Sequence, residues 1–499
     1  MSAPSPCPRA AIIGGGVIGG GWAARFALMG WGVAVFDPDP EAARKLGEVL
    51  ANARRALPGL ADAPLPPEGR VEIVPTISEA VRDADWIQES VPERLALKRK
   101  VYQQIQAHAP EGAVLASSTS GFKPSELQGC ASRPGQIIVA HPFNPVYLLP
   151  LVELVTTDAN DPALVEKARA VLASIGMHPL HLRREIDAHI ADRLLEAVWR
   201  EALWLVKDGI ATTGEIDDAI RMGFGLRWAQ MGLFETYRIA GGEAGMRHFL
   251  AQFGPALKWP WTKLMDVPDL DETLVEAIAA QSDAQSGSRS IRELERIRDA
   301  NLVTTLRALK ARRWGAGEVL ARHETMLEEA AALPRRLDEI ADLARPLPTL
   351  SRVVPLDWAD DSGHMGAARY AEAFLRATGR LLEMLGCEAS QQPQAGGYSI
   401  AETRLRHLAE VPLGAAIAVD SQLLGAEGAR LHLFHSMRAG GRLAATAEHI
   451  LLYRRPEDGR PAAPPARVAA NLANLAAAHA TLARPETVGE TRDARGAGG

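Results

Sequence analysis

Three glycines and one aspartate near the N-terminus have the types and spacing of a dinucleotide-binding turn. The glycines form Gly14-x-Gly16-x-x-Gly19, and Asp37 follows 18 residues after the last of them. Gly14 would allow a tight turn, Gly16 a close approach of a pyrophosphate, and Gly19 close packing of a helix on a strand. The alternative is a glycine-rich turn that binds no nucleotide.

The segments around these residues can position them for such binding. Apolar runs at residues 10–13 and 33–36 flank the glycines and a helical stretch, which predicts a βαβ unit. A helical stretch is expected at 22–29, and the free N–H groups at the start of the helix would face phosphates, so Val17 and Ile18 are counted with the glycines as candidate cofactor-binding residues. Because the Asp37 carboxylate can accept hydrogen bonds from ribose hydroxyls and repels a 2′-phosphate, the sequence favours NAD over NADP.

A histidine and a glutamate could supply acid–base chemistry beside this unit. His141 follows an expected strand at 137–140, and Glu153 comes 12 residues later. Oxidation of an alcohol needs a base for the hydroxyl proton, and an imidazole oriented by a carboxylate provides one near neutral pH. The alternative is that His141 only caps a turn after its strand.

Together these motifs resemble the 3-hydroxyacyl-CoA dehydrogenase family over residues 10 to about 310. Four motifs occur in the same order as in the family. They are the glycines, Val-Pro-Glu-Arg-Leu-Ala-Leu-Lys with Glu93 and Lys98, Ser-Ser-Thr-Ser-Gly with Ser120, and His-Pro-Phe-Asn-Pro beginning at His141. The resemblance implies that His141 is the general base and Glu153 its partner. It also implies that Ser120 and Asn144 position the substrate oxygen, and that Glu93 and Lys98 lie beside the nicotinamide.

The chain departs from the family pattern at two places. The family's Asn-Thr-Ser is Ser118-Thr-Ser120 here, and Asp192 stands where the family usually has Asn before Arg-Leu-Leu. A carboxylate that faces the substrate disfavours an anionic ligand and favours a cation. The alternative is that Asp192 pairs with Arg193 or caps its helix.

The region after Asp192 is rich in aromatic residues, which usually fill cores. Several of them near a carboxylate could instead surround a quaternary ammonium group; the candidates are Trp199, Trp204, Phe224, Trp228, Phe234, Tyr237, Phe253, Trp259 and Trp261. The motifs resemble the carnitine 3-dehydrogenase branch of the family. This implies that Asp192 and aromatic residues such as Phe143 receive the trimethylammonium group of L-carnitine, and that Arg193 or Lys123 binds its carboxylate.

The implied reaction is NAD-dependent oxidation of the 3-hydroxyl of L-carnitine to 3-dehydrocarnitine. A dehydrogenase of another small 3-hydroxy acid or of 3-hydroxyacyl-CoA is the alternative enzyme. A nucleotide-binding structural protein is the non-catalytic alternative.

The C-terminal region carries a second set of candidate residues. Trp358-Ala-Asp360-Asp361-Ser-Gly-His364-Met precedes an amphipathic helix at 367–385, and β-type segments follow at 397–409, 415–424, 429–437 and 442–454. This resembles the hotdog-fold acyl-CoA thioesterases. The resemblance implies that Asp360, or as second choice Asp361, activates water or attacks a betainyl-CoA thioester, and that His364 orders the loop. The alternative is a module retained only for dimerisation.

The fold class predicted is multidomain: a Rossmann-type α/β parallel sheet, then an all-α domain, then an α+β hotdog domain. In the N-terminal sheet we expect strands at 86–88, 113–116, 137–140 and 151–155. The predicted boundaries are 1–185 for NAD binding, 186–320 for the helical domain, 321–347 for a helical linker, 348–456 for the hotdog domain, and 457–499 for a tail with one helix.

Composition excludes several other classes of protein. The net charge of −6 with dispersed basic residues argues against nucleic-acid binding, and no apolar run is long enough to span a membrane. The cysteines, Cys7, Cys130 and Cys387, lack metal-ligand spacing, so we expect no metal site and a reducing cytoplasm. The resembled families imply a homodimer.

Overall fold

The computed structural model of this protein describes residues 7–129, 131–240, 243, 245–253, 262–263, 269, 271–286, 288–330, 333–355, 358–360, 362–387, 396–455, 459–486 and 488. The chain forms two compact units. Unit 1 comprises residues 1–57 and 66–323, and unit 2 comprises residues 58–65 and 324–499.

Unit 1 contains an eight-stranded sheet with the order β3-β2-β1-β4-β5-β6-β7-β8. Its strands are β1 (Arg9–Ile13), β2 (Gly32–Phe36), β3 (Val71–Ile73), β4 (Trp86–Glu89), β5 (Val114–Ser117), β6 (Ile137–Pro142), β7 (Leu151–Val155) and β8 (His178–His181). The central strands are apolar on both faces, as in a parallel sheet covered by helices on either side.

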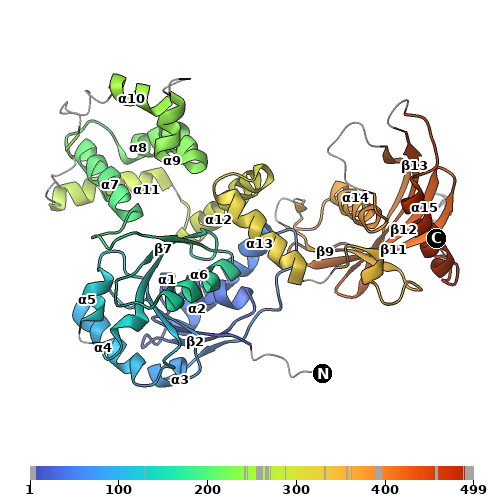
Figure 1. Cartoon of the computed structure of the whole chain (residues 1–499). Coiled ribbons are helices and arrows are strands. Elements are labelled where there is room, and N and C mark those ends of the chain that lie inside the picture. Colours follow the sequence, from blue (N-terminus) through green and yellow to red (C-terminus); the bar gives the residue numbers. More distant parts are fainter. Residues whose placement is uncertain are drawn as a thin grey trace, which may run out of the picture. The chain divides into compact units, whose positions relative to one another are not determined.

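Helices cover both faces of this sheet (Figure 1). They are α1 (Val17–Leu28), α2 (Ala42–Ala56), α3 (Ile77–Val81), α4 (Leu95–Gln106), α5 (Pro124–Gln128) and α6 (Pro162–Ser174). One core joins Ile13 and Leu115 of the sheet to Val101 and Leu127 of α4 and α5. The aromatic rings of Trp22 and Phe26 on α1 contact Trp86 of β4.

The predicted parallel sheet needs one correction. β7 runs antiparallel to β6, and β8 is parallel to β7. The segment between β6 and β7 is too short for the crossover helix that a parallel connection requires. The chain therefore turns back, and this reversal places His141 directly opposite Glu153 in the strand register.

The rest of unit 1 is helical, as predicted. It contains α7 (Ala191–Lys207), α8 (Thr213–Ala219), α9 (Gly225–Ala240), α10 (Gly245–Phe253), α11 (Glu272–Ser286), α12 (Ile291–Arg312) and the first half of α13 (Ala316–Ala330). α12 returns to α2, where Asn52 donates a hydrogen bond to Glu295.

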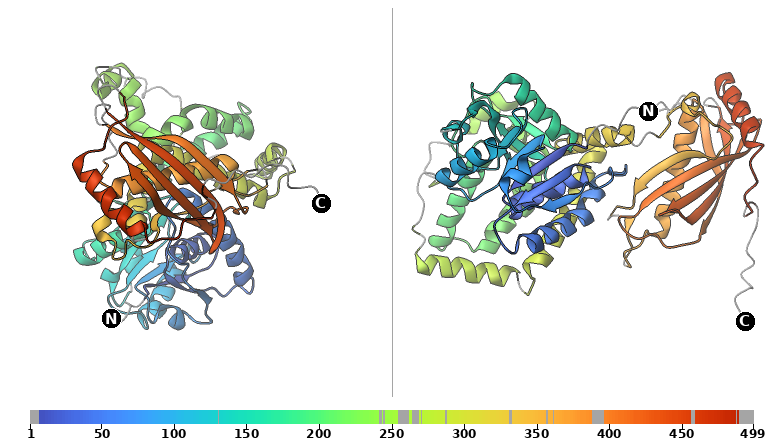
Figure 2. Two further views of the ribbon diagram at one scale, coloured as in Figure 1. Left: turned by 90° about the vertical axis from the view of Figure 1, so that its right-hand side faces the viewer. Right: turned by 90° about the horizontal axis from the view of Figure 1, so that it is seen from below.

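Unit 2 is an antiparallel sheet with helices packed on it (Figure 2). The order is β10-β13-β12-β11-β9, with β9 (Leu347–Val353), β10 (Gly397–His407), β11 (Ala416–Glu427), β12 (Arg430–Ala439) and β13 (Arg442–Arg454). α14 (Ala367–Met384) and α15 (Ala466–His479) share one apolar core with the sheet through Leu381, Leu433 and Leu472. The predicted hairpins and central helix are confirmed, whereas β9 was not predicted.

Candidate active sites

The glycine turn after β1 has the geometry that a bound dinucleotide requires. Gly14 has φ +98°, and a Cβ atom there would lie 2.7 Å from the carbonyl oxygen of Ser90. A Cβ atom on Gly19 would lie 1.7 Å from the carbonyl oxygen of Gly14. No atom lies within 4 Å of a Cβ atom built on Gly16, so the described structure leaves space there for a pyrophosphate.

The N-terminus of α1 has no side chain that would compete with or repel a phosphate group. Gly16 is its N-cap residue, with neither a side-chain cap nor an acidic residue in the first turn. Val17 is 63% exposed, and Ile18 is half-buried beside it. Asp37 follows β2 and accepts a hydrogen bond of 2.6 Å from the backbone N–H of Gly15, so its carboxylate lies at the turn. These residues fit the adenosine and diphosphate of NAD.

His141 and Glu153 form a buried pair on β6 and β7. The distance from His141 Nδ1 to a Glu153 carboxylate oxygen is 3.0 Å, and Glu153 is fully buried. A carboxylate can only accept at neutral pH, so Nδ1 carries the hydrogen and Nε2 presents its lone pair. The arrangement leaves Nε2 free to take a proton.

Glu153 also holds the first turn of α7. Its second carboxylate oxygen accepts hydrogen bonds of 2.9 Å from the backbone N–H groups of Ile190 and Ala191. Burial alone would raise the pKa of Glu153, but the hydrogen bonds from His141 and these two N–H groups lower it below the ordinary value. One ionised carboxylate thus orients both the imidazole and the helix that carries Asp192.

Asp192 lies next to the free nitrogen of His141. Its carboxylate oxygen is 3.6 Å from Nε2, and its side chain is 20% exposed. The residue is in the first turn of α7, but α7 has no side-chain cap hydrogen bond. The alternative that Asp192 caps the helix is therefore wrong, and no ion pair with Arg193 is found among the described residues.

Two further rings surround His141. Phe143 packs edge-on against it with ring centroids 5.0 Å apart, and His189 lies at 5.5 Å. His189 is fully buried, and its Nε2 donates to the carbonyl oxygen of Thr119. Burial lowers the pKa of His189, so the ring is neutral. His189 was missed from the sequence, where it stands in the charged segment 183–190 and belongs to no recognised motif.

The other substrate candidates are exposed. Ser120 and Asn144 lie at the surface, and no hydrogen bond of either side chain is found in the part of the chain that the structure describes. Arg193 is exposed as well. Lys123 is paired with Asp187 at 3.1 Å, which leaves Arg193 as the more available of the two predicted carboxylate partners.

Lys98 belongs to a buried polar cluster, and Glu93, whose side chain is 45% exposed, lies at the edge of it. Lys98 is 1% exposed and contacts Glu89 at 2.9 Å and Glu93 at 3.2 Å. Glu89, which sequence reasoning missed, also accepts hydrogen bonds from Tyr102 and Ser117. Burial alone would raise the pKa of Glu93, but Thr119, Lys98 and the Gly121 N–H lower it, so the carboxylate is ionised.

The aromatic residues of the helical region have other contacts. Trp204 stacks with Lys207 and Lys263, Phe224 with Trp228, and Phe249 with Tyr237 and Phe253. Trp199 and Phe234 are exposed. Trp259 and Trp261 lie outside the described residues. Among the predicted aromatic partners of a cation that the structure describes, Phe143 is the one whose ring contacts His141.

Unit 2 presents Asp360 on the loop before α14. One of its carboxylate oxygens accepts from the Ser362 hydroxyl at 2.6 Å and from the His364 N–H at 3.1 Å. The Ser362 hydroxyl is 2.9 Å from His364 Nδ1, and His364 Nε2 is 3.8 Å from Glu410. The Ser362 hydroxyl and the backbone N–H groups lower the pKa of Asp360.

The neighbourhood of Asp360 suits attack on a carbonyl. The N-terminus of α14 has Gly366 as N-cap, without a side-chain cap or an acidic first turn. Its unsatisfied N–H groups can stabilise negative charge that develops on a carbonyl oxygen. Asp361, the second choice, lies outside the described residues.

The described residues contain neither a metal cluster nor a membrane-spanning helix. Within them, no three or more His, Cys, Asp or Glu side chains gather as ligands for a metal ion. None of the described helices combines the length and apolar character needed to cross a membrane.

Family models match three consecutive parts of the chain. The NAD binding domain of 3-hydroxyacyl-CoA dehydrogenase matches residues 9–186, and the C-terminal domain of the same enzyme matches residues 189–285. The thioesterase-like superfamily matches residues 354–472.

Curated relatives match almost the whole length. An L-carnitine dehydrogenase/betainyl-CoA thioesterase of Ruegeria pomeroyi is 63% identical over 96% of this chain and 98% of its own. One of Rhizobium meliloti is 51% identical with the same coverage. An L-carnitine dehydrogenase of Mesorhizobium japonicum is 58% identical and covers 65% of this chain and 90% of its own.

A solved structure supports the fold of unit 1. A 5-formyl-3-hydroxy-2-methylpyridine 4-carboxylic acid 5-dehydrogenase, an NAD+-dependent dismutase, is 26% identical over 61% of this chain and 99% of its own, with a TM-score of 0.51.

Proposed function

Because this chain belongs to the family of L-carnitine dehydrogenase/betainyl-CoA thioesterases, we propose that unit 1 oxidises the 3-hydroxyl of L-carnitine with NAD and that unit 2 hydrolyses betainyl-CoA. The observation that carries the first activity is the carboxylate of Asp192 at 3.6 Å from His141 Nε2. This places a negative charge beside the atom that receives the hydroxyl proton.

His141 acts as the general base. The Glu153 carboxylate keeps the hydrogen on Nδ1, so that Nε2 can take the proton from the substrate hydroxyl. The same carboxylate and Asp192 then stabilise the imidazolium that forms. Ser120 and Asn144, both exposed, hold the substrate oxygen in this account.

Asp192 selects the substrate. In carnitine the quaternary nitrogen is attached to the carbon next to the carbinol carbon, so the ammonium group and the hydroxyl lie close together. A base and a carboxylate only 3.6 Å apart match this spacing. The Phe143 ring adds a cation–π surface next to His141, and Arg193 binds the substrate carboxylate.

Bound NAD supplies the hydride acceptor for the hydrogen on the carbinol carbon. Gly14, Gly16 and Gly19 with the start of α1 would hold its diphosphate, and Asp37 the adenosine ribose. Glu93 and Lys98 shape the nicotinamide end through the buried cluster around Glu89.

In unit 2, Asp360 activates a water molecule that attacks the thioester carbonyl. The hydrogen bonds from Ser362 and His364 fix the orientation of its carboxylate. The N-terminus of α14 stabilises the oxyanion, and the products are betaine and free coenzyme A.

A homodimer through the helical region completes the proposal. α7 is amphipathic, yet none of its described residues is buried, and Leu194, Leu195 and Trp199 are each more than half exposed. An apolar pocket of about 490 Å³ lies between α7 and α8. A second copy of the chain would cover this face. We place the protein in the cytoplasm, where the free thiols of Cys7 and Cys387 remain reduced.

Two assays on the purified chain test the two activities separately. NADH formation is followed with L-carnitine, D-carnitine and 3-hydroxybutyrate, and thiol release is followed with betainyl-CoA. We expect strong oxidation of L-carnitine alone and rapid release of coenzyme A. Oxidation of 3-hydroxybutyrate instead would refute the cation site, and a lack of thiol release would refute the role of Asp360.

A further inference from the structure

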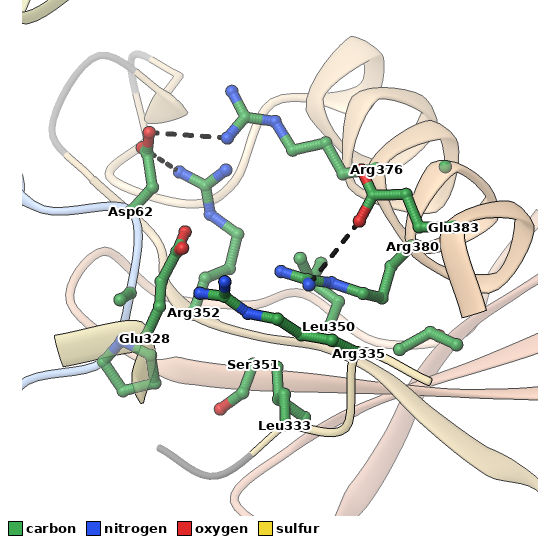
Figure 3. Close-up of a pocket in the computed structure, with 14 residues that line it drawn as sticks. Asp62, Glu328, Leu333, Arg335, Leu350, Ser351, Arg352, Arg376, Arg380 and Glu383 are labelled. Carbon is green, nitrogen blue, oxygen red and sulfur yellow. Dashed lines mark hydrogen bonds and ion pairs between the residues drawn. The ribbon is translucent and has the colours of Figure 1, made fainter. Parts of the chain in front are cut away.

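Unit 2 contains a charged cavity that is lined by none of the proposed catalytic residues. Its volume is about 320 Å³, within the range of small-molecule sites. It is lined by one face of α14, by β9, by the chain around Arg335, and by residues 62–64 of the same unit. Figure 3 shows the guanidinium groups of Arg335, Arg352, Arg376 and Arg380 gathered around one space.

Three of the four arginines are held in place by carboxylates. Asp62 contacts Arg352 at 2.8 Å and Arg376 at 3.4 Å, and Glu383 is 3.5 Å from Arg380. Arg335 has no ion pair among the described residues. The four arginines face three lining carboxylates, Asp62, Glu328 and Glu383, and Arg376 also pairs with Glu372 at 2.9 Å. Guanidinium groups remain charged and match the geometry of phosphate oxygens, so this cavity suits a phosphate-bearing anion.

A glycine in the middle of α14 keeps the cavity open. Gly379 lies on the same helical face as Arg376, Arg380 and Glu383, and no atom lies within 4 Å of a Cβ atom built on it. A glycine inside a helix costs about 1 kcal/mol relative to alanine. A side chain at this lining position would take up part of the cavity.

The cavity is connected to the loop of Asp360. The guanidinium of Arg352 stacks on the Trp358 ring with 3.7 Å to its centroid, and Arg376 lies 5.8 Å from the same ring. Trp358 is fully buried and stands two residues before Asp360. A ligand bound by these arginines would therefore lie beside the segment that carries Asp360.

We propose that this cavity binds the phosphate groups of an adenosine diphosphate moiety, and that coenzyme A, the carrier of the thioester, supplies it. The inference rests on the proposed hydrolysis by unit 2. The pantetheine arm separates the diphosphate of coenzyme A from its sulfur by many bonds, so the phosphates can bind away from Asp360. NAD carries the same adenosine diphosphate chemistry and is the other source.

Calorimetry on the full chain separates the two sources. Coenzyme A is titrated into protein saturated with NAD, and NADH is titrated in a separate experiment. We expect one coenzyme A to bind per chain despite the NAD, and to bind more weakly at higher ionic strength. If NADH instead binds at two sites per chain and excludes coenzyme A, the assignment to coenzyme A is overturned.

Variants link the binding to this cavity. Gly379→Leu fills the space with a good helix former, and Arg335→Ala removes an arginine that has no ion pair. Each should weaken coenzyme A binding about tenfold, the value of one charge-assisted contact. Glu328→Gln removes a lining carboxylate and should strengthen binding. Arg442→Ala, an exposed arginine of unit 2 outside the cavity, is the matched control and should change nothing.

Steady-state kinetics with two thioesters test the role of the cavity separately from the thioesterase activity of unit 2. The substrates are betainyl-CoA and the betainyl thioester of N-acetylcysteamine, which lacks the nucleotide. Gly379→Leu and Arg335→Ala should raise KM about tenfold for the first and leave the second unchanged. Equal effects on both thioesters, or none, would overturn the cavity's role. If wild type cleaves neither thioester, the hydrolysis fails, while the calorimetry still decides whether the cavity binds the nucleotide.

Discussion

Substitution of Glu153 by glutamine changes the residue that accepts hydrogen bonds both from His141 and from the start of α7. The fully buried carboxylate accepts from His141 Nδ1 at 3.0 Å and from the N–H groups of Ile190 and Ala191 at 2.9 Å. Glutamine has one oxygen and one NH₂ group in the same shape. The new side chain can therefore satisfy either the histidine or the helix as before, but not both.

Energies decide which orientation is adopted. With the NH₂ group towards α7, two partly buried backbone N–H groups lose their acceptor, at a cost of about 1 kcal/mol each, the lower end of the range because Ile190 is 42% exposed. With the NH₂ group towards His141, no group is left unpaired if the imidazole moves its hydrogen from Nδ1 to Nε2. The second orientation is therefore favoured by about 2 kcal/mol. His141 then has no lone pair at Nε2 with which to accept the substrate proton.

Glu153→Gln should accordingly lower kcat for L-carnitine by about 10²–10⁴-fold, as for other bases held in the wrong tautomer. NADH binding, measured by fluorescence, should not change, and the thermal midpoint should fall only slightly. Glu166→Gln, which removes the same charge from an exposed pair with Arg169, is the control. A Glu153→Gln enzyme with nearly wild-type kcat would refute the tautomer argument and with it the role of Glu153.

Three further predictions concern other residues. Asp192→Asn should raise KM for L-carnitine about tenfold or more without changing NADH affinity, because it removes the charge that faces the ammonium group; an unchanged KM in steady-state assays would contradict this. Asp360→Asn should lower betainyl-CoA hydrolysis about 10²-fold or more while carnitine oxidation continues; loss of both activities would point to misfolding instead. Burial lowers the pKa of His449 from 6.5 to about 4. As pH falls from 6.5 towards 4, only the unfolded chain takes up this proton, so unit 2 should lose about 3 kcal/mol of stability. Thermal unfolding of wild type and His449→Gln across this range should show a flatter pH dependence in the variant.

Local patterns predicted much of the fold. The glycine turn, the helical middle region and the glycine-marked hairpins depend on neighbouring residues, and the structure contains each of them. The reversal at β7 was not predicted, because strand direction is set by pairing with β6 rather than by the composition of β7. The sequence also did not predict that residues 58–65 belong to unit 2, because this depends on contacts with distant segments rather than on local composition.

The site was predictable where a residue belongs to a motif. His141, Glu153 and Asp192 were named from their motifs, and the structure brings them together through the β6–β7 register and the first turn of α7. Glu89 and His189 were missed because their contacts come from distant segments: Glu89 accepts from Tyr102 and Ser117, and His189 reaches Thr119 across 70 residues. Such partners become visible only when the chain has folded.

We propose that Asp192 makes the dehydrogenase site selective for a cation. The most direct measurement compares kcat/KM for L-carnitine with that for its neutral analogue, in which a tert-butyl group replaces the trimethylammonium group without changing its shape. We expect a preference for L-carnitine of about tenfold or more, the difference in affinity that one charge contact provides. Equal values for the two substrates would contradict it.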